Sequence, residues 1–335
     1  MKLTNHITGE TLEMTFRPLC PADIPEAINC IREAYGDTYV KPYLYTEEGF
    51  LAHSFHGNLS FSVAQAPDGA LGGIIAHETS PLFPGQAEIA CQVIHRSASG
   101  YGLALPLALY QLRQAEKEMF SSYFARALGC HVISQKTLAG MGFTHCGFLP
   151  SVFDKTQFHT LYQTGRNLKI SQTVAARRGT KSDAGPLSLP DRLVPLARLV
   201  YDGMGMSWRL RGTVLLPPGE GRWEQTEDLR HKVLTLWARQ LGDGFAQALS
   251  ARIAPVRDRP LQTVNLFLNL SSPGAAQAVQ MAQAQGFLAT GFLPGGQDGE
   301  YLILHHPLNT PFDVDQIPYL SDYKPFAAEI RRQCS

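Results

Sequence analysis

A nine-residue segment occurs twice in this chain of 335 residues, and this repeat limits the folds available to it. Residues 142–150 read GFTHCGFLP and residues 286–294 read GFLATGFLP, with six identities in nine positions. In both places the pattern predicts a strand and a helix before the segment. A glycine that ends a helix before a strand is common, but chance rarely repeats the flanking elements as well. The repeat therefore favours two copies of one mixed α/β unit over two unrelated joints.

The N-terminal half alternates strand and helix patterns. A first helix opens at Asp23, and its apolar residues Ile24, Ala27, Ile28 and Ile31 have the spacing of one buried face. Asp68-Gly69 predicts a tight hairpin turn. The predicted strands are 12–19, 58–66, 70–78, 88–95, 120–127, 143–149 and 167–175. The other predicted helices are 46–55, a helix from about 102 to 118, and 134–141.

Residues 177–186 lack apolar periodicity and have the composition of a loop, so the domain boundary is expected there. The chain then divides into residues 1–177 and residues 186–335. In the second half the pattern predicts a helix from near Pro190, a strand at 207–216, a long helix within 223–250, a strand at 263–270, a helix at 273–285, and strands near 287–293 and 301–305.

Residues 99–104 read SGYGLA and lie between a predicted strand and the next helix. Small residues let a ligand approach the backbone closely, and the unpaired amides at a helix start favour anions such as pyrophosphate. The segment matches neither the P-loop nor the G-x-G-x-x-G fingerprint. A phosphate site and a simple glycine turn both remain open on this evidence.

The order of elements resembles the GCN5-related N-acetyltransferase (GNAT) superfamily. That order is a strand, two helices, three antiparallel strands, a glycine turn, a helix, a strand, a helix and a strand pair. The pyrophosphate loop of the superfamily reads Gln/Arg-x-x-Gly-x-Gly/Ala. Gly102 and Ala104 occupy its two small positions here, whereas Ser99 stands where Gln or Arg is usual.

A closer resemblance is to bacterial GNAT proteins that are found with, or fused to, anti-sigma-factor kinase-like domains. The shared features are YGDTY at 35–39, Glu88, the pattern HVISQK at 131–136, and the segments 189–201 and 286–294. They span most of the chain. The resemblance implies an α/β (α+β) fold of tandem GNAT-like domains, each a mostly antiparallel sheet flanked by helices, with the second copy degenerate.

The resemblance also implies acetyl-CoA as the co-substrate. The fourth and fifth strands part to admit its pantetheine arm, whose amides pair with the backbone near Val93 and Ile94. The pyrophosphate lies on the amides of the glycine turn, and the acceptor amine attacks the thioester directly. The predicted cofactor-binding residues are Val93, Ile94, Ser99, Gly100, Tyr101, Gly102, Leu103 and Ala104.

The amine must lose a proton, so a base is required within reach. Glu88 is the first candidate, although a carboxylate at the solvent end of a strand is equally compatible with the sequence. His131 could serve as base, proton relay or helix cap. Residues 134–141 contain no Tyr, the residue that protonates the leaving thiolate in many members of the superfamily.

Aromatic residues between the first two helices could shape an acceptor pocket. Tyr35, Asp37 and Tyr39 are the predicted substrate-binding residues, and the alternative is that the tyrosines only cap helix ends. In the second half, residues 217–222 are interrupted by prolines, which remove amide donors. The sequence therefore predicts that the second copy lacks a comparable glycine loop and that each chain has one active site.

Composition narrows the function classes. Lys+Arg and Asp+Glu number 29 each, and a zero formal charge argues against a nucleic-acid binder. No apolar run is long enough to span a bilayer. The six cysteines form no C-x-x-C pair, so neither a zinc site nor a disulfide framework is expected. These features favour a cytoplasmic protein that uses no metal.

The leading hypothesis is an N-acetyltransferase that moves an acetyl or short acyl group to a small amine or a protein amino group. The alternative is a catalytically silent acyl-CoA sensor or interaction module with a signalling partner. An RNA-modifying acyltransferase fits the zero net charge poorly.

Overall fold

The computed structural model describes all residues except 6, 155–168, 258–262, 309–311 and 335. The predicted strand at 167–175 falls partly outside the described residues. The N-terminal half contains β1 (Lys2–Thr4), β2 (Thr11–Glu13), β3 (Thr15–Pro18), α1 (Ile24–Tyr35), α2 (Glu47–Phe55), β4 (Leu59–Gln65), β5 (Leu71–Thr79), β6 (Gln86–Ile94), α3 (Ala104–Glu116), β7 (Ser122–Leu128), α4 (Ile133–Gly140), β8 (Thr144–Asp154) and β9 (Lys169–Arg178).

The C-terminal half begins with a small two-stranded sheet and a helix and continues the main sheet. Its elements are β10 (Asp183–Leu187), α5 (Val194–Gly203), β11 (Ser207–Leu210), β12 (Arg222–Asp228), β13 (Val233–Gln240), α6 (Phe245–Arg257), β14 (Thr263–Asn269), α7 (Ala275–Ala284), β15 (Leu288–Leu293), β16 (Tyr301–His306) and α8 (Lys324–Cys334).

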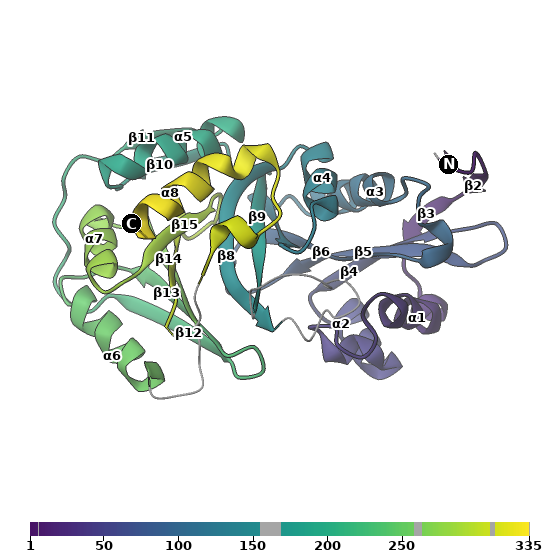
Figure 1. Cartoon of the computed structure of the whole chain (residues 1–335), viewed down its shortest axis with the longest axis horizontal. Helices are drawn as coiled ribbons and strands as arrows, with labels where there is room; N and C mark the ends of the chain where they lie inside the picture. The colour runs from purple at the N-terminus through teal and green to yellow at the C-terminus, as the bar shows by residue number, and fades with distance from the viewer. Residues whose placement is uncertain (6, 155–168, 258–262, 309–311, 335) are drawn as a thin grey trace.

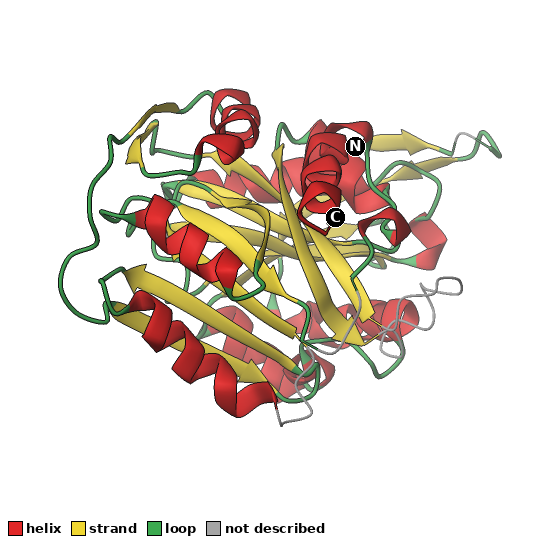
Figure 2. Cartoon of the chain, turned by 60° about the vertical axis from the view of Figure 1, so that its left-hand side comes forward, coloured by secondary structure: helices red, strands yellow, loops and turns green. Residues whose placement is uncertain are grey.

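One sheet of twelve strands runs through both halves, in the order β12-β13-β14-β16-β15-β8-β9-β7-β6-β5-β4-β3. In the N-terminal half, α1 and α2 cover one face of the sheet and α3 and α4 cover the other (Figure 1). Figure 2 shows helices of the C-terminal half against the same continuous layer of strands. The chain is therefore a mixed α/β protein whose sheet is flanked by helices.

The two halves repeat one topology. Outward from the centre of the sheet, β8-β9-β7-β6-β5 and β15-β16-β14-β13-β12 have the same neighbours and the same directions. In each copy only the third pair, β7/β6 or β14/β13, is parallel. The repeat that the sequence suggested is thus a repeat of the fold, and no described strand beyond β12 corresponds to β3 and β4.

The two repeated segments meet at the centre of the sheet. β8 pairs with β15 through Gly147 and Gly291, which occupy the same position of the repeat. A Cβ on Gly147 would lie 2.3 Å from the Cα of Gly291, and a Cβ on Gly291 would lie 2.7 Å from the carbonyl oxygen of Cys146. Side chains at either position would separate the backbones, so the shared glycine allows the halves to join.

The long helix predicted within 223–250 is wrong. Residues 222–228 and 233–240 are the strands β12 and β13, and α6 begins only at Phe245. In β13, Leu234, Leu236 and Trp237 are all buried. A strand covered on both faces shows a continuous apolar run rather than alternation, and such a run is easily mistaken for a buried helix.

The strand predicted at 207–216 is shorter than expected. β11 ends at Leu210, where its pairing with β10 ends, and no strand follows before Arg222. The sequence predicted no helix or strand beyond residue 307. The structure has α8 there, and its Phe326, Ala327 and Ile330 are buried. Helix α8 packs against β15 and completes the C-terminal core.

Candidate functional site

The parallel strands β6 and β7 part in the middle of the sheet. They pair only from Gln86–Glu88 to Ser122–Phe124, although β6 continues to Ile94 and β7 to Leu128. Beyond Glu88, no described strand pairs with the edge of β6 that faces β7. The parting expected between the fourth and fifth strands of the main sheet of this half is confirmed.

The gap holds a cavity of about 470 Å³ that passes through the sheet. Its lining includes Ile89, which belongs to the apolar cluster beneath α3, and Cys91, which belongs to the cluster beneath α1 on the other face. The volume lies within the range of small-molecule sites. Strand parting thus opens a route from one face of the sheet to the other.

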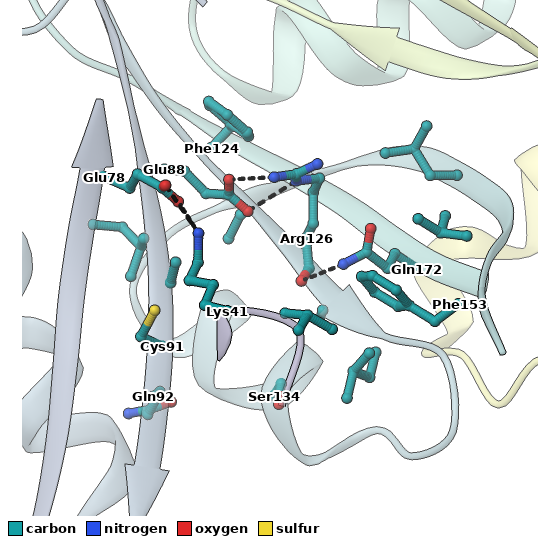
Figure 3. Close-up of a pocket in the computed structure, with 18 of the residues that line it drawn as sticks. Lys41, Glu78, Glu88, Cys91, Gln92, Phe124, Arg126, Ser134, Phe153 and Gln172 are labelled. Atoms are coloured by element: carbon teal, nitrogen blue, oxygen red, sulfur yellow. Dashed lines mark hydrogen bonds and ion pairs between the residues drawn. The ribbon is translucent and has the colours of Figure 1, made fainter. Parts of the chain in front are cut away.

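Two acids face each other at the start of the gap. Glu78 on β5 and Glu88 on β6 are directly paired cross-strand neighbours, and like charges in this arrangement repel. Each carboxylate has its own cation. Lys41 Nζ donates to Glu78 at 2.7 and 2.9 Å, and Arg126 donates from Nη2 and Nε to Glu88 at 2.6 and 2.9 Å (Figure 3).

The Glu88–Arg126 pair crosses the parting strands. Arg126 lies on β7, so its bidentate contact joins the two strands just where their backbone pairing stops. The guanidinium carbon also lies 5.9 Å from the centre of the Phe83 ring. Glu88 lines the cavity as expected, but the sequence did not identify Arg126 as its partner.

Strand β6 carries a bulge inside the gap. The register with β5 shifts between Ile74 and Ala76, opposite Cys91, whose φ is +55°. Cys91 is buried, and burial raises the pKa of its thiol to about 11. The thiol is therefore protonated at neutral pH, which suits a packing residue rather than a nucleophile.

The glycine turn before α3 presents a row of unoccupied amides. The amide N–H groups of residues 100–104 have no acceptor among the described residues. Gly100 and Gly102 have φ values of +84° and +71°, which glycine adopts without strain. Ser99 and Gly102 are exposed and Leu103 is buried beneath the turn. The Tyr101 hydroxyl donates to Glu10 at 3.2 Å.

Other predicted residues divide between the cavity and the surface. Tyr35, Tyr39 and His131 line the cavity, whereas Asp37 is exposed and outside the lining. The rings of Tyr35 and Tyr39 lie 4.7 Å apart. Burial lowers the pKa of His131, and its Nδ1 has no partner in the described part of the chain.

The backbones of Val93 and Ile94 pair with β5 on one side only. Their partners are Ile74 and Gly73, and the opposite edge faces the gap. Ser134, in the first turn of α4, also lines the cavity. The sequence did not select this hydroxyl, although its place directly after β7 could have indicated it.

The second copy has a glycine turn after all, and the prediction that it lacks one is wrong. The turn is Leu241-Gly242-Asp243-Gly244, between β13 and α6, and it falls within the range 223–250 over which the sequence predicted a helix. Two of its amides donate to the chain itself. Asp243 N donates to Pro217 O at 2.8 Å and Gly244 N donates to Gly219 O at 3.0 Å.

The strands of the second copy also stay closed. β13 and β14 pair from Val233–Thr263 to Ala238–Leu268 without a break. The Asp243 carboxylate accepts from Gly219 N at 2.8 Å, which ties the loop of residues 217–219 to this turn. The second copy therefore has continuous strand pairing where the first copy has a gap, and its glycine turn is covered by a loop.

The C-terminal half nevertheless contributes one wall of the cavity. Residues from β12, β13, β14 and the turn between β12 and β13 line it, and they are Thr226, Asp228, His231, Val233, Thr235, Trp237, Asn265 and Phe267. The sequence did not assign these residues to a site, and the helix predicted within 223–250 also concealed β12 and β13. Their contribution follows from the junction of the two copies.

No three His, Cys, Asp or Glu side chains within the described ranges gather as a metal site would require. None of the helices that the structure describes is long and apolar enough to cross a membrane.

No protein-family model matches the sequence, and no curated protein matches it. Similar solved structures include a GNAT-superfamily phosphinothricin acetyltransferase from Sinorhizobium meliloti in complex with acetyl-CoA (17% identity, 50% of this chain, 88% of that chain, TM-score 0.39). Others are an N-acetyltransferase from Staphylococcus aureus (16%, 50% and 98%, TM-score 0.41) and a ribosomal-protein-alanine N-acetyltransferase from Brucella melitensis (16%, 49% and 99%, TM-score 0.40). Each resembles about half of this chain.

Proposed function

We propose that the N-terminal half transfers an acetyl or short acyl group from acetyl-CoA to an amine. The observation that carries this proposal is the combination of parted parallel strands with an unoccupied glycine turn at the start of the next helix. The gap accommodates an extended arm with backbone groups along β6, and the turn offers amides to a diphosphate. The second copy has the same elements with both features closed, which supports one site per chain.

The bound co-substrate would run from the turn into the gap. The amides of residues 100–104 would hold the diphosphate, and the unpaired edge of β6 near Val93 and Ile94 would pair with the pantetheine amides. The thioester would then lie near the Cys91 bulge, where a β6 amide can stabilise the developing oxyanion. The cofactor role of these residues is part of the proposal.

The acceptor amine would enter from the face that carries Tyr35 and Tyr39. Its nitrogen attacks the thioester carbonyl carbon, the C–S bond breaks, and the sulfur leaves as thiolate. Glu88, positioned by Arg126, accepts the proton of the amine directly or through a water. His131 stays a candidate relay, and Ser134 is a hydroxyl in the lining that could donate to the sulfur.

A second function is favoured by one observation, which is that both oxygens of Glu88 are engaged by Arg126. If that pair is structural, the chain would bind acyl-CoA without turnover and act as a sensor with a signalling protein as partner. The division into domains 1–177 and 186–335 belongs to the same proposal, because the cavity wall from the second domain would then couple ligand binding to that domain.

Release of free thiol separates the two functions. We expect the protein, mixed with acetyl-CoA and primary amines, to release coenzyme A at a rate well above that of buffer, and only when an amine is present. A sensor would bind acetyl-CoA in a calorimetric titration and release no thiol with any amine. That second result would contradict the proposed transferase.

A further inference from the structure

The cavity wall from the C-terminal half contains a stacked pair of aromatic side chains. Trp237 on β13 and Phe267 on β14 are paired neighbours, and their rings stack at 5.5 Å with an interplanar angle of 8°. The Phe83 ring meets both edge-on, at 6.3 and 6.1 Å. These three side chains, the aromatic wall, all line the cavity.

The aromatic wall is held in place. Arg239 lies 5.9 Å from the Trp237 ring centre, and its Nη2 donates to Leu82 O at 2.8 Å, next to Phe83. The same guanidinium is paired with Glu224 and Asp298. A wall fixed from behind by a buried, fully paired cation is a preformed surface for a flat apolar group.

One polar group in the aromatic wall has no partner. The Trp237 Nε1 is buried and has no acceptor in the part of the chain that the structure describes. Trp237 itself is 3% exposed, so the unmet hydrogen bond costs free energy in the free protein. A ligand that places an oxygen beside the indole would accept this hydrogen bond.

The aromatic wall also lies close to the reacting groups. Phe83 contacts the Arg126 guanidinium on one side and the Trp237–Phe267 pair on the other. Arg126 in turn holds Glu88. Contacts through Phe83 and Arg126 therefore link the Trp237–Phe267 pair to the proposed base. Among the described residues that line this wall, Asp228 is the one carboxylate, and a negative charge there favours a cation over an anion.

We propose that the acceptor is an arylalkylamine with an oxygen on its ring. The ring packs against Trp237 and Phe267, the oxygen accepts a hydrogen bond from Trp237 Nε1, and a short alkyl chain carries the amine to Glu88. This inference rests on the proposed function. It makes Trp237, a residue of the degenerate copy, the specificity residue of the site in the first copy.

The test compares tyramine, phenethylamine, 2-cyclohexylethylamine and spermidine as acceptors, with thiol release as the readout. We expect the lowest KM for tyramine and at least about tenfold higher KM for the two non-aromatic amines. Calorimetric titration of each amine into the protein saturated with coenzyme A should give the same order of affinities, without turnover.

Two variants separate the roles of the indole. Trp237→Phe keeps a ring and loses the N–H, so the KM for tyramine should rise about fivefold while that for phenethylamine stays unchanged. Trp237→Leu should raise the KM for both amines. Trp223→Phe is the matched control, because Trp223 lies outside the cavity lining and its Nε1 donates to Glu220 O.

The outcomes are distinguishable. If acetyl-CoA binds and spermidine is acetylated as well as tyramine, or if Trp237→Phe leaves the tyramine KM unchanged, the acceptor inference is overturned and the transferase stands. If acetyl-CoA does not bind, the proposed function itself fails. Unchanged acetyl-CoA affinity in both Trp237 variants shows that they remain folded.

Discussion

Glu78 and Glu88 show how neighbouring residues of one type acquire different roles from their partners. They face each other across two strands, yet Glu78 is neutralised by a lysine from the loop before α2 and Glu88 by an arginine from the parting strand. Only the second pair spans the gap. Position relative to the gap, rather than residue type, makes Glu88 the better candidate for proton transfer.

Replacing Glu88 by Gln tests that role. The substitution keeps the shape and removes the proton acceptor, so thiol release should fall about 100-fold or more while acetyl-CoA affinity is retained. The measurement is the rate of thiol release with acetyl-CoA and an amine, together with a calorimetric titration of acetyl-CoA.

Glu78→Gln is the matched variant, because it removes an equal charge from the opposite strand. Its rate of thiol release should stay close to that of the wild type. If both variants release thiol at similar rates, Glu88 is not the base, and His131, whose pKa is lowered by burial, becomes the stronger candidate.

Sequence alone could identify Glu88 because a resemblance supplied its position on the strand. It could not identify Arg126 or Trp237, because both matter only through contacts made far along the chain. Glu88 and Arg126 are 38 residues apart, and no local pattern records which arginine meets which carboxylate across a sheet. Asp37 shows the converse, since it lies within a motif but stays at the surface.

At the scale of elements, the two glycine turns differ by what occupies their amides. The turn before α3 is open, and the turn before α6 is covered by the backbone of residues 217–219 and by Asp243. The sequence pattern G-x-G is the same in both. A glycine turn thus indicates a local conformation, whereas its availability to a phosphate depends on the neighbouring loop.

Gly102→Glu tests the open turn. A Cβ at Gly102 meets nothing within 4 Å, so the substitution does not clash, and the new carboxylate would repel a diphosphate. We expect acetyl-CoA to bind at least about tenfold more weakly, measured by calorimetry. Gly102→Gln carries the same backbone strain at positive φ without the charge, and it should bind more tightly than Gly102→Glu. Equal affinities of the two variants would place the diphosphate elsewhere.

Strand and helix patterns predicted most of the N-terminal elements because surface and core residues alternate there in regular periods. The face of α1 is buried as expected at Ile24, Ala27, Ile28 and Ile31. The pattern failed at β13, which is covered on both sides. Packing of residues from distant segments against both faces of the sheet creates that burial, so a local window cannot detect it.

At the scale of the whole molecule, a repeated glycine joins two copies of one unit into a single sheet. Gly147 and Gly291 bring β8 against β15, and the core of the C-terminal half includes residues of β7, β8 and β9. The repeat could be read from the sequence, but the junction could not. That junction places Trp237 and Phe267 of the closed copy beside the gap of the open one.

Amide hydrogen exchange, with and without acetyl-CoA, tests the central claim most directly because it reports on both glycine turns in one experiment. The account predicts that acetyl-CoA slows exchange at residues 100–104, whose amides donate to none of the described residues, and leaves residues 242–244 unchanged. Protection confined to residues 242–244, or no protection at either turn at saturating acetyl-CoA, would contradict it.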